Sequence, residues 1–167
     1  MTDKFEMARK LLASGDVRRW HTTRDLNQTT AEHSWGVAMI ISLYHPSPSV
    51  DLLRAALLHD CHEKLFGDIP SPIKDRWPEI KRAEEYAELL FFHNLGLLSP
   101  YDLLSVSDLA WLDWADKLEA YYFLYGRPGQ EAYDMRINLI KKIDEAWDEV
   151  QNWSTIGKPW AEWKDNI

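Results

Sequence analysis

Apolar residues recur every three or four positions through most of this 167-residue chain, which is the spacing of one face of an α-helix. The segment 130–153 shows the pattern over its whole length. Its apolar stripe consists of Tyr133, Ile137, Ile140, Ile143, Ala146, Trp147 and Val150. No run alternates Val, Ile or Thr with polar residues for long enough to predict a strand, and we find no internal repeat. The chain is therefore expected to be all-α.

Glycine, proline and capping residues divide this pattern into about six helices. The expected helices cover residues 5–13, 30–44, a segment from Ser49 or Asp51 to Gly67, 78–94, 107–125 and 130–153. Thr29 fits the N-cap of the second helix, with Glu32 reaching back to complete a capping box. We expect one domain over residues 1–167. Its Trp-rich tail, about 154–167, is expected to pack on the body or on a neighbour.

Composition narrows the classes of partner and compartment. The formal net charge is -8, which argues against a nucleic-acid polymer as a nonspecific partner. The single cysteine, Cys61, excludes an intrachain disulfide framework. The first residues lack the apolar run of a signal peptide, and no stretch approaches the ~20 apolar residues that span a bilayer. These features favour a cytoplasmic protein with no membrane partner.

The segment 57–68 is where the chemistry is expected. A helix that begins as the apolar run 53–58 then presents polar and ionisable side chains, and Gly67 ends it. His59 and Asp60 are adjacent, so they lie about 100° apart around a helix and can both lean toward one ion. Glu63 follows His59 by four residues and shares its face, beside the ion.

Two more metal ligands have to come from elsewhere in the chain. His33 lies in or near the first turn of the helix at 30–44, and Asp116 sits inside an apolar helical stretch. A buried carboxylate needs a cation nearby, which favours Asp116, while Asp113 one turn earlier is the rival ligand. Mixed imidazole and carboxylate ligands suit Zn, Mn, Fe or Co rather than Ca.

In these motifs the chain resembles the HD-domain phosphohydrolases, and more closely their bacterial and phage 5′-deoxynucleotidase-like branch. The matching pieces are Arg19-Trp20, Ala31-Glu32-His33-Ser34, His59-Asp60-Cys61-His62-Glu63, Gly67-Asp68-Ile69-Pro70-Ser71-Pro72-Ile73-Lys74 and Ala115-Asp116-Lys117-Leu118. The resemblance implies a helical HD-domain bundle in which one divalent transition metal (Zn, Co or Mn) is held by His33, His59, Asp60 and Asp116. It also implies a homo-oligomer, a dimer or hexamer.

Glu63 and Asp68 are the acid/base candidates. A carboxylate beside a metal can take the proton of bound water and deliver it to the leaving oxygen. By spacing alone Glu63 is favoured, and the resemblance adds Asp68 as a donor to the leaving group. The alternatives are a solvated helix end for Glu63 and a turn-forming residue for Asp68. His62 is a bystander or a partner of the ligands, and Cys61 is expected to serve packing.

Four cations are candidates for binding phosphate: Arg18, Arg19, Lys74 and Lys117. Arginine offers phosphate a planar fork, and lysine offers a mobile point charge. By resemblance Arg19 holds phosphate and Trp20 packs on the sugar or base, where a flat ring against C2′ leaves little room for a 2′-hydroxyl. Surface charge is the alternative for Arg18, and a core aromatic is the alternative for Trp20.

The leading hypothesis is a metal-dependent hydrolase of deoxynucleotide 5′-phosphates, a small-molecule substrate. We favour a dNTP triphosphohydrolase acting on dATP, as in short phage members of this branch, because several cations cluster near the site. An additional Mg or similar ion could accompany a triphosphate. A 5′-deoxynucleotidase acting on dNMPs is the first alternative. A silent metal- or nucleotide-binding module is the second, and a Trp-rich interaction protein is the third. The expected place of action is the bacterial cytosol, or the host cytosol for a phage-encoded chain.

Overall fold

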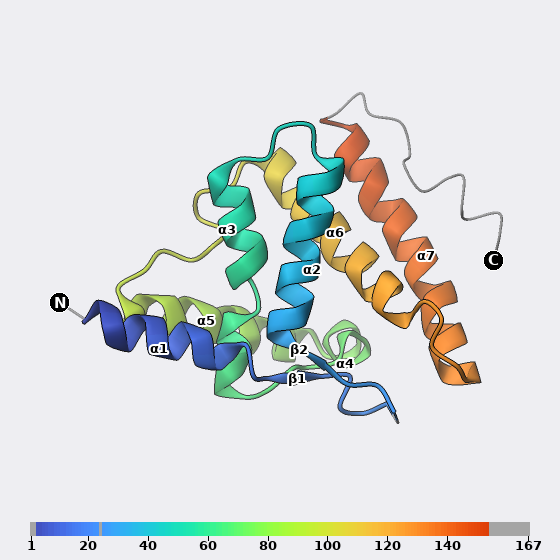
Figure 1. Ribbon diagram of the computed structural model, residues 1–167, viewed down its shortest axis with the longest axis horizontal. Helices are drawn as coiled ribbons and strands as arrows, with labels where there is room; N and C mark the ends of the chain where they lie inside the picture. Colours follow the sequence, from blue (N-terminus) through green and yellow to red (C-terminus); the bar gives the residue numbers. More distant parts are fainter. Residues whose placement is uncertain (1–2, 24, 154–167) are drawn as a thin grey trace. The chain divides into compact units, whose positions relative to one another are not determined.

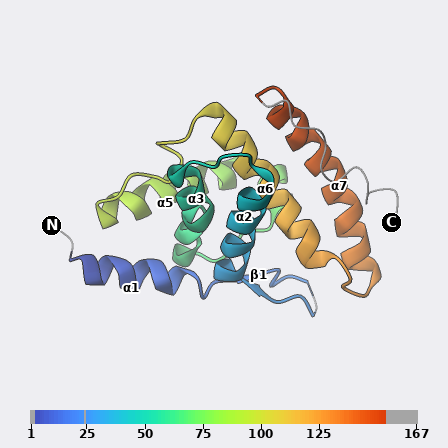
Figure 2. The same cartoon turned by 45° about the horizontal axis from the view of Figure 1, so that its top comes forward.

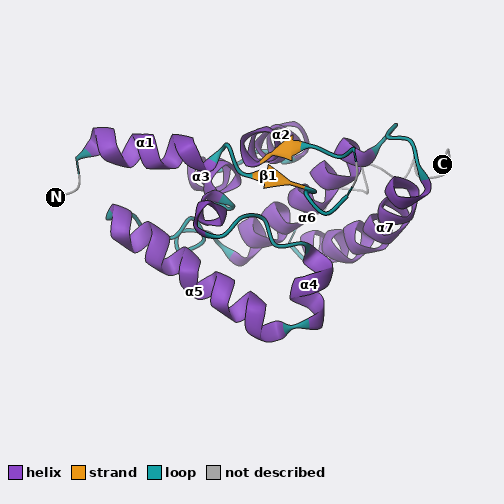
Figure 3. Ribbon diagram, turned by 90° about the horizontal axis from the view of Figure 1, so that it is seen from below, coloured by secondary structure: helices purple, strands orange, loops and turns teal. Residues whose placement is uncertain are grey.

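The computed structural model describes residues 3–23 and 25–153, and seven α-helices lie within that part of the chain. They are α1 (Lys4–Ser14), α2 (Thr30–Tyr44), α3 (Val50–Leu58), α4 (Ser71–Arg76), α5 (Pro78–Leu95), α6 (Val106–Leu124) and α7 (Gln130–Gln151). The short 3₁₀-helix η1 (Cys61–Leu65) follows α3. The all-α expectation is confirmed (Figures 1 and 3). The Trp-rich tail lies outside the described residues.

The chain divides into two compact units, Met1–Trp35 with Arg54–Leu103, and Gly36–Leu53 with Leu104–Ile167. In the first unit η1 packs against both α1 and α5. Helix α4 packs against α5 (Figure 3). Its apolar core joins Cys61 of η1 to three buried residues of α5, Phe91, Phe92 and Leu95. This packing fixes η1, which carries Glu63, against two longer helices. The expected single domain over 1–167 stays a prediction.

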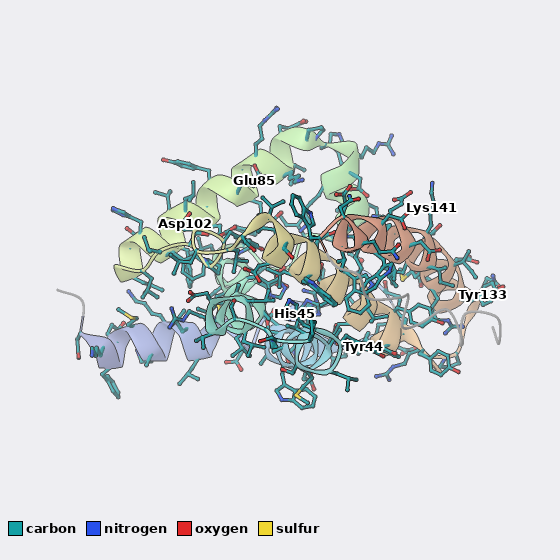
Figure 4. All side chains as sticks on the ribbon, turned by 90° about the horizontal axis from the view of Figure 1, so that it is seen from above. Tyr44, His45, Glu85, Asp102, Tyr133 and Lys141 are labelled. Carbon is teal, nitrogen blue, oxygen red and sulfur yellow. The ribbon has the colours of Figure 1, made fainter. Side chains whose placement is uncertain are left out.

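The second unit is built on α6 and α7, which lie side by side (Figures 1 and 2). Trp111, Trp114 and Trp147 are buried there with ring centroids 4.9–5.5 Å apart. Tyr44 and His45 lie at the end of α2, where Figure 4 labels them. Their rings are edge-on to those of Trp114 and Trp111, with centroids 5.5 and 4.7 Å apart. These three of the chain's nine tryptophans therefore serve this core.

Local sequence signals place most helix ends. Thr29 and Glu32 form the expected capping box, since the Glu32 N–H donates to Thr29 Oγ1 and the Thr29 N–H donates to Glu32 Oε2, at 3.1 and 2.7 Å. Ser105 and Asp108 form a second box at α6. Gly96 ends α5 with φ +70°, a left-handed conformation that glycine adopts without strain.

Three local expectations were wrong. The helix expected to carry the His59–Asp60 pair ends at Leu58, and the pair lies in the turn between α3 and η1. The six-residue segment Ser71–Arg76 forms an additional helix, α4, where the sequence predicted only a break between helices. Arg18–Arg19 and Gln28–Thr29 pair as the antiparallel strands β1 and β2, with Arg19 opposite Gln28. Two-residue strands are too short to leave an alternating pattern.

Within the described residues no helix combines the length and the low polarity that a bilayer crossing requires.

Candidate metal and hydrolytic site

His33, His59 and Asp60 come together in the first unit as a group that could hold a metal ion. His33 lies in the first turn of α2, and the other two lie just after α3. The two Nε2 atoms are 3.3 Å apart. Asp60 Oδ2 lies 3.5 Å from the Nε2 of His33 and 3.3 Å from that of His59. Three ligand atoms thus form a nearly equilateral triangle.

The edges of this triangle fit a transition metal. Tetrahedral ligands at about 2.1 Å from a zinc ion lie about 3.4 Å from one another. The donor set, two imidazoles and one carboxylate, is also one that zinc, cobalt and manganese accept. Three residues predicted as ligands from the sequence therefore lie where one ion could touch all of them.

The backbone fixes which nitrogen of His59 faces the triangle. Its Nδ1 lies 2.9 Å from the carbonyl oxygen of Ala56, so Nδ1 carries the proton and donates it there. Nε2 then keeps its lone pair for a metal, the usual arrangement of a metal-binding histidine whose other nitrogen donates to a carbonyl. His59 and His33 are both buried, which shields the site from water.

Asp60 is held ionised in this triangle. Burial alone would raise its pKa, but the electrostatic interactions of Asp60 with His59 and with the Arg19 guanidinium outweigh burial and hold the pKa well below its usual range. Arg19 donates a hydrogen bond to Asp60 Oδ2. The guanidinium that was expected to bind phosphate thus reaches the site, where it is paired with a candidate metal ligand.

Glu63 lies beside the triangle and is buried. Its pKa is raised to about 9, first by burial and then by the negative charges of Asp60 and Asp68. Thr30 at the start of α2 lies 3.1 Å from Glu63, Oγ1 to Oε2. The structure therefore rules out the solvated helix end that was the alternative for Glu63. A buried carboxyl with a strongly shifted pKa beside candidate metal ligands is typical of an acid/base group.

Asp68 and Trp20 lie in the same unit. The Asp68 side chain is 13% exposed, and its Oδ2 is 3.9 Å from Nδ1 of His21. Trp20 has the left-handed backbone value φ 60°, and its ring N–H donates to Gln28 Oε1 at 3.0 Å. This backbone conformation is uncommon for a tryptophan, and the hydrogen bond to Gln28 restrains the direction of the ring.

Lys74 is partnered by Glu84, a residue that the sequence did not single out. The Lys74 ammonium lies 3.1 Å from Glu84 Oε1, and the same oxygen lies 3.7 Å from His62 Nε2. His62 Nδ1 in turn lies 3.0 Å from the carbonyl oxygen of His59. Glu84 on α5 thus links α4 to η1 next to the triangle, and His62 contacts both Glu84 and the backbone of His59.

The remaining predicted residues have the following places. Asp116 and Lys117 lie half-buried on α6, in the second unit, and Lys117 pairs with Asp113 one turn earlier. Because Asp113 is exposed and forms an ion pair with Lys117, it is a weaker candidate for the rival metal ligand. Arg18 is exposed and donates to Asn27 Oδ1 at 2.7 Å. Asp116 as fourth ligand and Lys117 as phosphate partner stay predictions.

Two residues of the site, Thr30 and Glu84, were not predicted from the sequence, and the reasons can be identified. Thr30 directly follows Thr29. The capping box accounted for this Thr-Thr pair, so the sequence suggested no further contact for the Thr30 hydroxyl. Glu84 stands among several charged residues at the start of α5, and nothing in that segment distinguishes it from a solvated face. Only the fold shows that Thr30 and Glu84 contact Glu63 and Lys74.

Comparison with known proteins supports the location of the candidate site in the first unit. A family model described as HD domain matches residues 16–106, more than half of the chain. That range contains His33, His59, Asp60, Glu63 and Asp68. It ends before Asp116.

Two individual proteins are also similar. A dATP triphosphohydrolase of Acinetobacter phage SH-Ab 15497 is 26% identical over 153 residues, a match covering 81% of this chain and 75% of the relative. The solved structure of the cyanophage S-2L HD phosphohydrolase DatZ, bound to dA and one catalytic Zn²⁺ ion, has a TM-score of 0.64 and 22% identity. It covers 92% of this chain and 94% of that one, so the two share a fold.

Proposed function

The chain belongs to the HD-domain family, and from this premise we propose that it is a metal-dependent hydrolase of deoxynucleotide 5′-phosphates. The substrate we favour is dATP, cleaved to deoxyadenosine and triphosphate. The observation that carries the proposal is the triangle of His33, His59 and Asp60 with the buried Glu63 beside it. The names of the phage relative and of DatZ support the choice of substrate class.

In this proposal His33, His59 and Asp60 hold one divalent transition metal, and Asp116 is retained as a fourth ligand from the sequence pattern alone. A divalent ion held there would supply Lewis-acid chemistry, which would favour deprotonation of the attacking water and the ionised form of Glu63. Burial otherwise raises the pKa of Glu63 to about 9. Glu63 is then able to take a proton from the attacking water.

The other residues bind and complete proton transfer. Water oxygen attacks the α-phosphorus as the bond to O5′ breaks, and Glu63 or Asp68 gives a proton to the departing O5′. Arg19 and Lys74 neutralise phosphate charge, with Arg18 and Lys117 as further candidates. Because Arg19 and Lys74 are paired with Asp60 and Glu84, phosphate has to share or replace those acceptors. Trp20 packs on the deoxynucleoside.

The decisive experiment is to incubate the purified chain with Zn²⁺, Co²⁺ or Mn²⁺ and dATP, dAMP or ATP, and to separate the products. Triphosphate and deoxyadenosine from dATP are expected, with little reaction of ATP. Inorganic phosphate from dAMP alone would instead support a 5′-deoxynucleotidase. Bound metal with no turnover of any nucleotide would support a silent binding module, and no bound metal would support the interaction protein.

Two further predictions accompany the proposal. A reaction on free deoxynucleotides is expected in the cytoplasm, that of the host if the chain is phage-encoded. Self-association as a dimer or hexamer stays a prediction from the family resemblance. Light scattering on the purified chain measures its mass directly.

A further inference from the structure

Thr30 makes a buried contact with Glu63 that links two segments 33 residues apart. Thr30 is the first residue of α2, and Glu63 lies in η1. The two residues are 1% and 2% exposed, and the Thr30 hydroxyl oxygen lies 3.1 Å from Glu63 Oε2. Water therefore does not compete for this hydrogen bond, which restrains the direction of the carboxyl group.

Thr30 itself is fixed by the backbone around it. Its N–H donates to the carbonyl oxygen of Val17 at 2.9 Å. The same carbonyl oxygen lies 3.5 Å from the Thr30 hydroxyl, at the long limit of a hydrogen bond. The hydroxyl thus has two neighbours, Glu63 on one side and Val17 on the other.

A hydroxyl differs from a backbone N–H because it can both donate and accept. When Glu63 is ionised, Thr30 donates its proton to the carboxylate. When Glu63 carries a proton, the acid O–H donates to the Thr30 oxygen, and the Thr30 proton turns toward the Val17 carbonyl. Thr30 keeps its own proton in both arrangements. A side chain that only donates would favour the ionised acid alone.

We propose that Thr30 is a positioning residue that holds the carboxyl group of Glu63 in one orientation. The inference rests on the proposed function, because the orientation of Glu63 affects turnover only if Glu63 transfers a proton in the reaction. Thr30 contacts neither water nor substrate in this role. It acts through Glu63, and the family resemblance did not assign it any part.

The test compares Thr30→Val, which keeps the shape and removes the hydroxyl, with Thr30→Ser, which keeps the hydroxyl. We expect Thr30→Val to lower kcat about 10- to 100-fold with KM within about twofold, the loss expected for a hydrogen bond to a charged group. Thr30→Ser should stay within about threefold of the wild type.

A double-mutant cycle separates positioning from support of the fold. In a Glu63→Gln background, Thr30→Val should cause no further loss of kcat, because the group it orients is already disabled. Thr29→Val is the matched control: it removes the neighbouring cap hydroxyl and should lower stability while leaving kcat unchanged. Bound metal per chain and urea unfolding of each variant provide readouts that do not depend on turnover.

The outcomes distinguish this inference from the proposed function. A wild-type chain that hydrolyses no deoxynucleotide refutes the function and the positioning role with it. An active wild type overturns the role alone in three cases. These are an unchanged kcat in Thr30→Val, an equal loss in Thr30→Ser, or the same fold-loss when Glu63 is already Gln. Any of these would assign Thr30 to packing at the start of α2.

Discussion

The Nε2 atoms of His33 and His59 face each other at 3.3 Å, closer than two unprotonated nitrogens would stay without a proton or a cation between them. A shared metal satisfies both. We therefore expect His33→Ala and His59→Ala each to abolish stoichiometric binding of Zn²⁺, measured by elemental analysis of the purified chain. His93→Ala, a change of an exposed histidine on α5, is the control and should retain the metal.

The same site links metal binding to stability. Adding zinc at 100 times its Kd stabilises a folded protein by about 2.7 kcal/mol. Chelation should therefore lower the Tm of the wild type and of His93→Ala, and leave the Tm of His33→Ala and His59→Ala unchanged. Equal effects of chelator on all four proteins would place the metal elsewhere.

Glu63 is expected to matter for turnover and not for metal binding. Glu63→Gln keeps the size of the side chain but removes its ability to accept a proton, a loss that typically lowers kcat by about 10²–10⁴-fold. Metal content should stay at the wild-type value, because Glu63 is not part of the three-ligand triangle. Glu79→Gln, at an exposed position of α5, should be indistinguishable from the wild type. Retained activity in Glu63→Gln would remove Glu63 from the reaction.

The sequence predicted the components of this site better than it predicted their local conformation. His33, His59 and Asp60 could be selected because metal ligands are chemically distinctive and interrupt apolar helices. The helix end at Leu58 could not be foreseen, since polar residues after an apolar run are equally compatible with one more helical turn. Glu63 was expected on the same helical face as His59, four residues later. It lies instead in η1, after a turn, yet it is still beside the ligands.

Burial was predicted well where packing is dense and poorly elsewhere. In α7 the expected stripe holds for Ile143, Ala146, Trp147 and Val150, which are buried, whereas Tyr133 is 44% exposed (Figure 4). In α5 the inward face runs through Phe91, Phe92 and Leu95, whereas Leu90 is 41% exposed. A periodic pattern gives the direction of a face only to within one residue, and tertiary contacts decide the rest.

Glu84 should contribute to stability through Lys74 and His62. Burial tends to raise the pKa of Glu84, but the nearby His62 ring and the hydrogen-bonded ammonium of Lys74 outweigh burial and keep the pKa below its usual value. Glu84→Gln is therefore expected to lower the free energy of unfolding by about 1–3 kcal/mol, the range for hydrogen bonds to charged groups. Glu85→Gln, at the next and exposed position, is the matched control and should change it by less than about 0.5 kcal/mol (Figure 4).

The capping box at α2 predicts an acid-dependent contribution to stability. The pKa of Glu32 is lowered, first by the backbone N–H of Thr29 and then by its hydroxyl. A lowered folded-state pKa means that the stabilisation is present above the ordinary glutamate pKa and is lost as the pH falls through the folded value. Glu32→Gln can keep the hydrogen bonds without the charge, so it should flatten this part of the stability profile.

Urea unfolding between pH 7 and pH 3 measures the effect. Thr29→Ala should cost about 1 kcal/mol at pH 7 and should remove much of the same acid dependence, since it deletes a cap. A profile for Glu32→Gln that parallels the wild type would show that Glu32 titrates in the folded chain as it does in the unfolded one.

Gly36 in α2 is expected to resist replacement by alanine, although alanine is the better helix former by about 1 kcal/mol. A Cβ at position 36 would lie 2.7 Å from Cγ of Glu119 and 2.9 Å from its Oε1. Glu119 is 8% exposed, so its side chain has little room to withdraw. Overpacking of this kind costs about 1–3 kcal/mol, which exceeds the gain in helix propensity. Gly36→Ala should therefore lower the free energy of unfolding in urea. In a Glu119→Ala background the same change should become neutral or stabilising, because the atoms it meets are gone. Equal effects of Gly36→Ala in both backgrounds would place its cost in the backbone and not in the contact with Glu119.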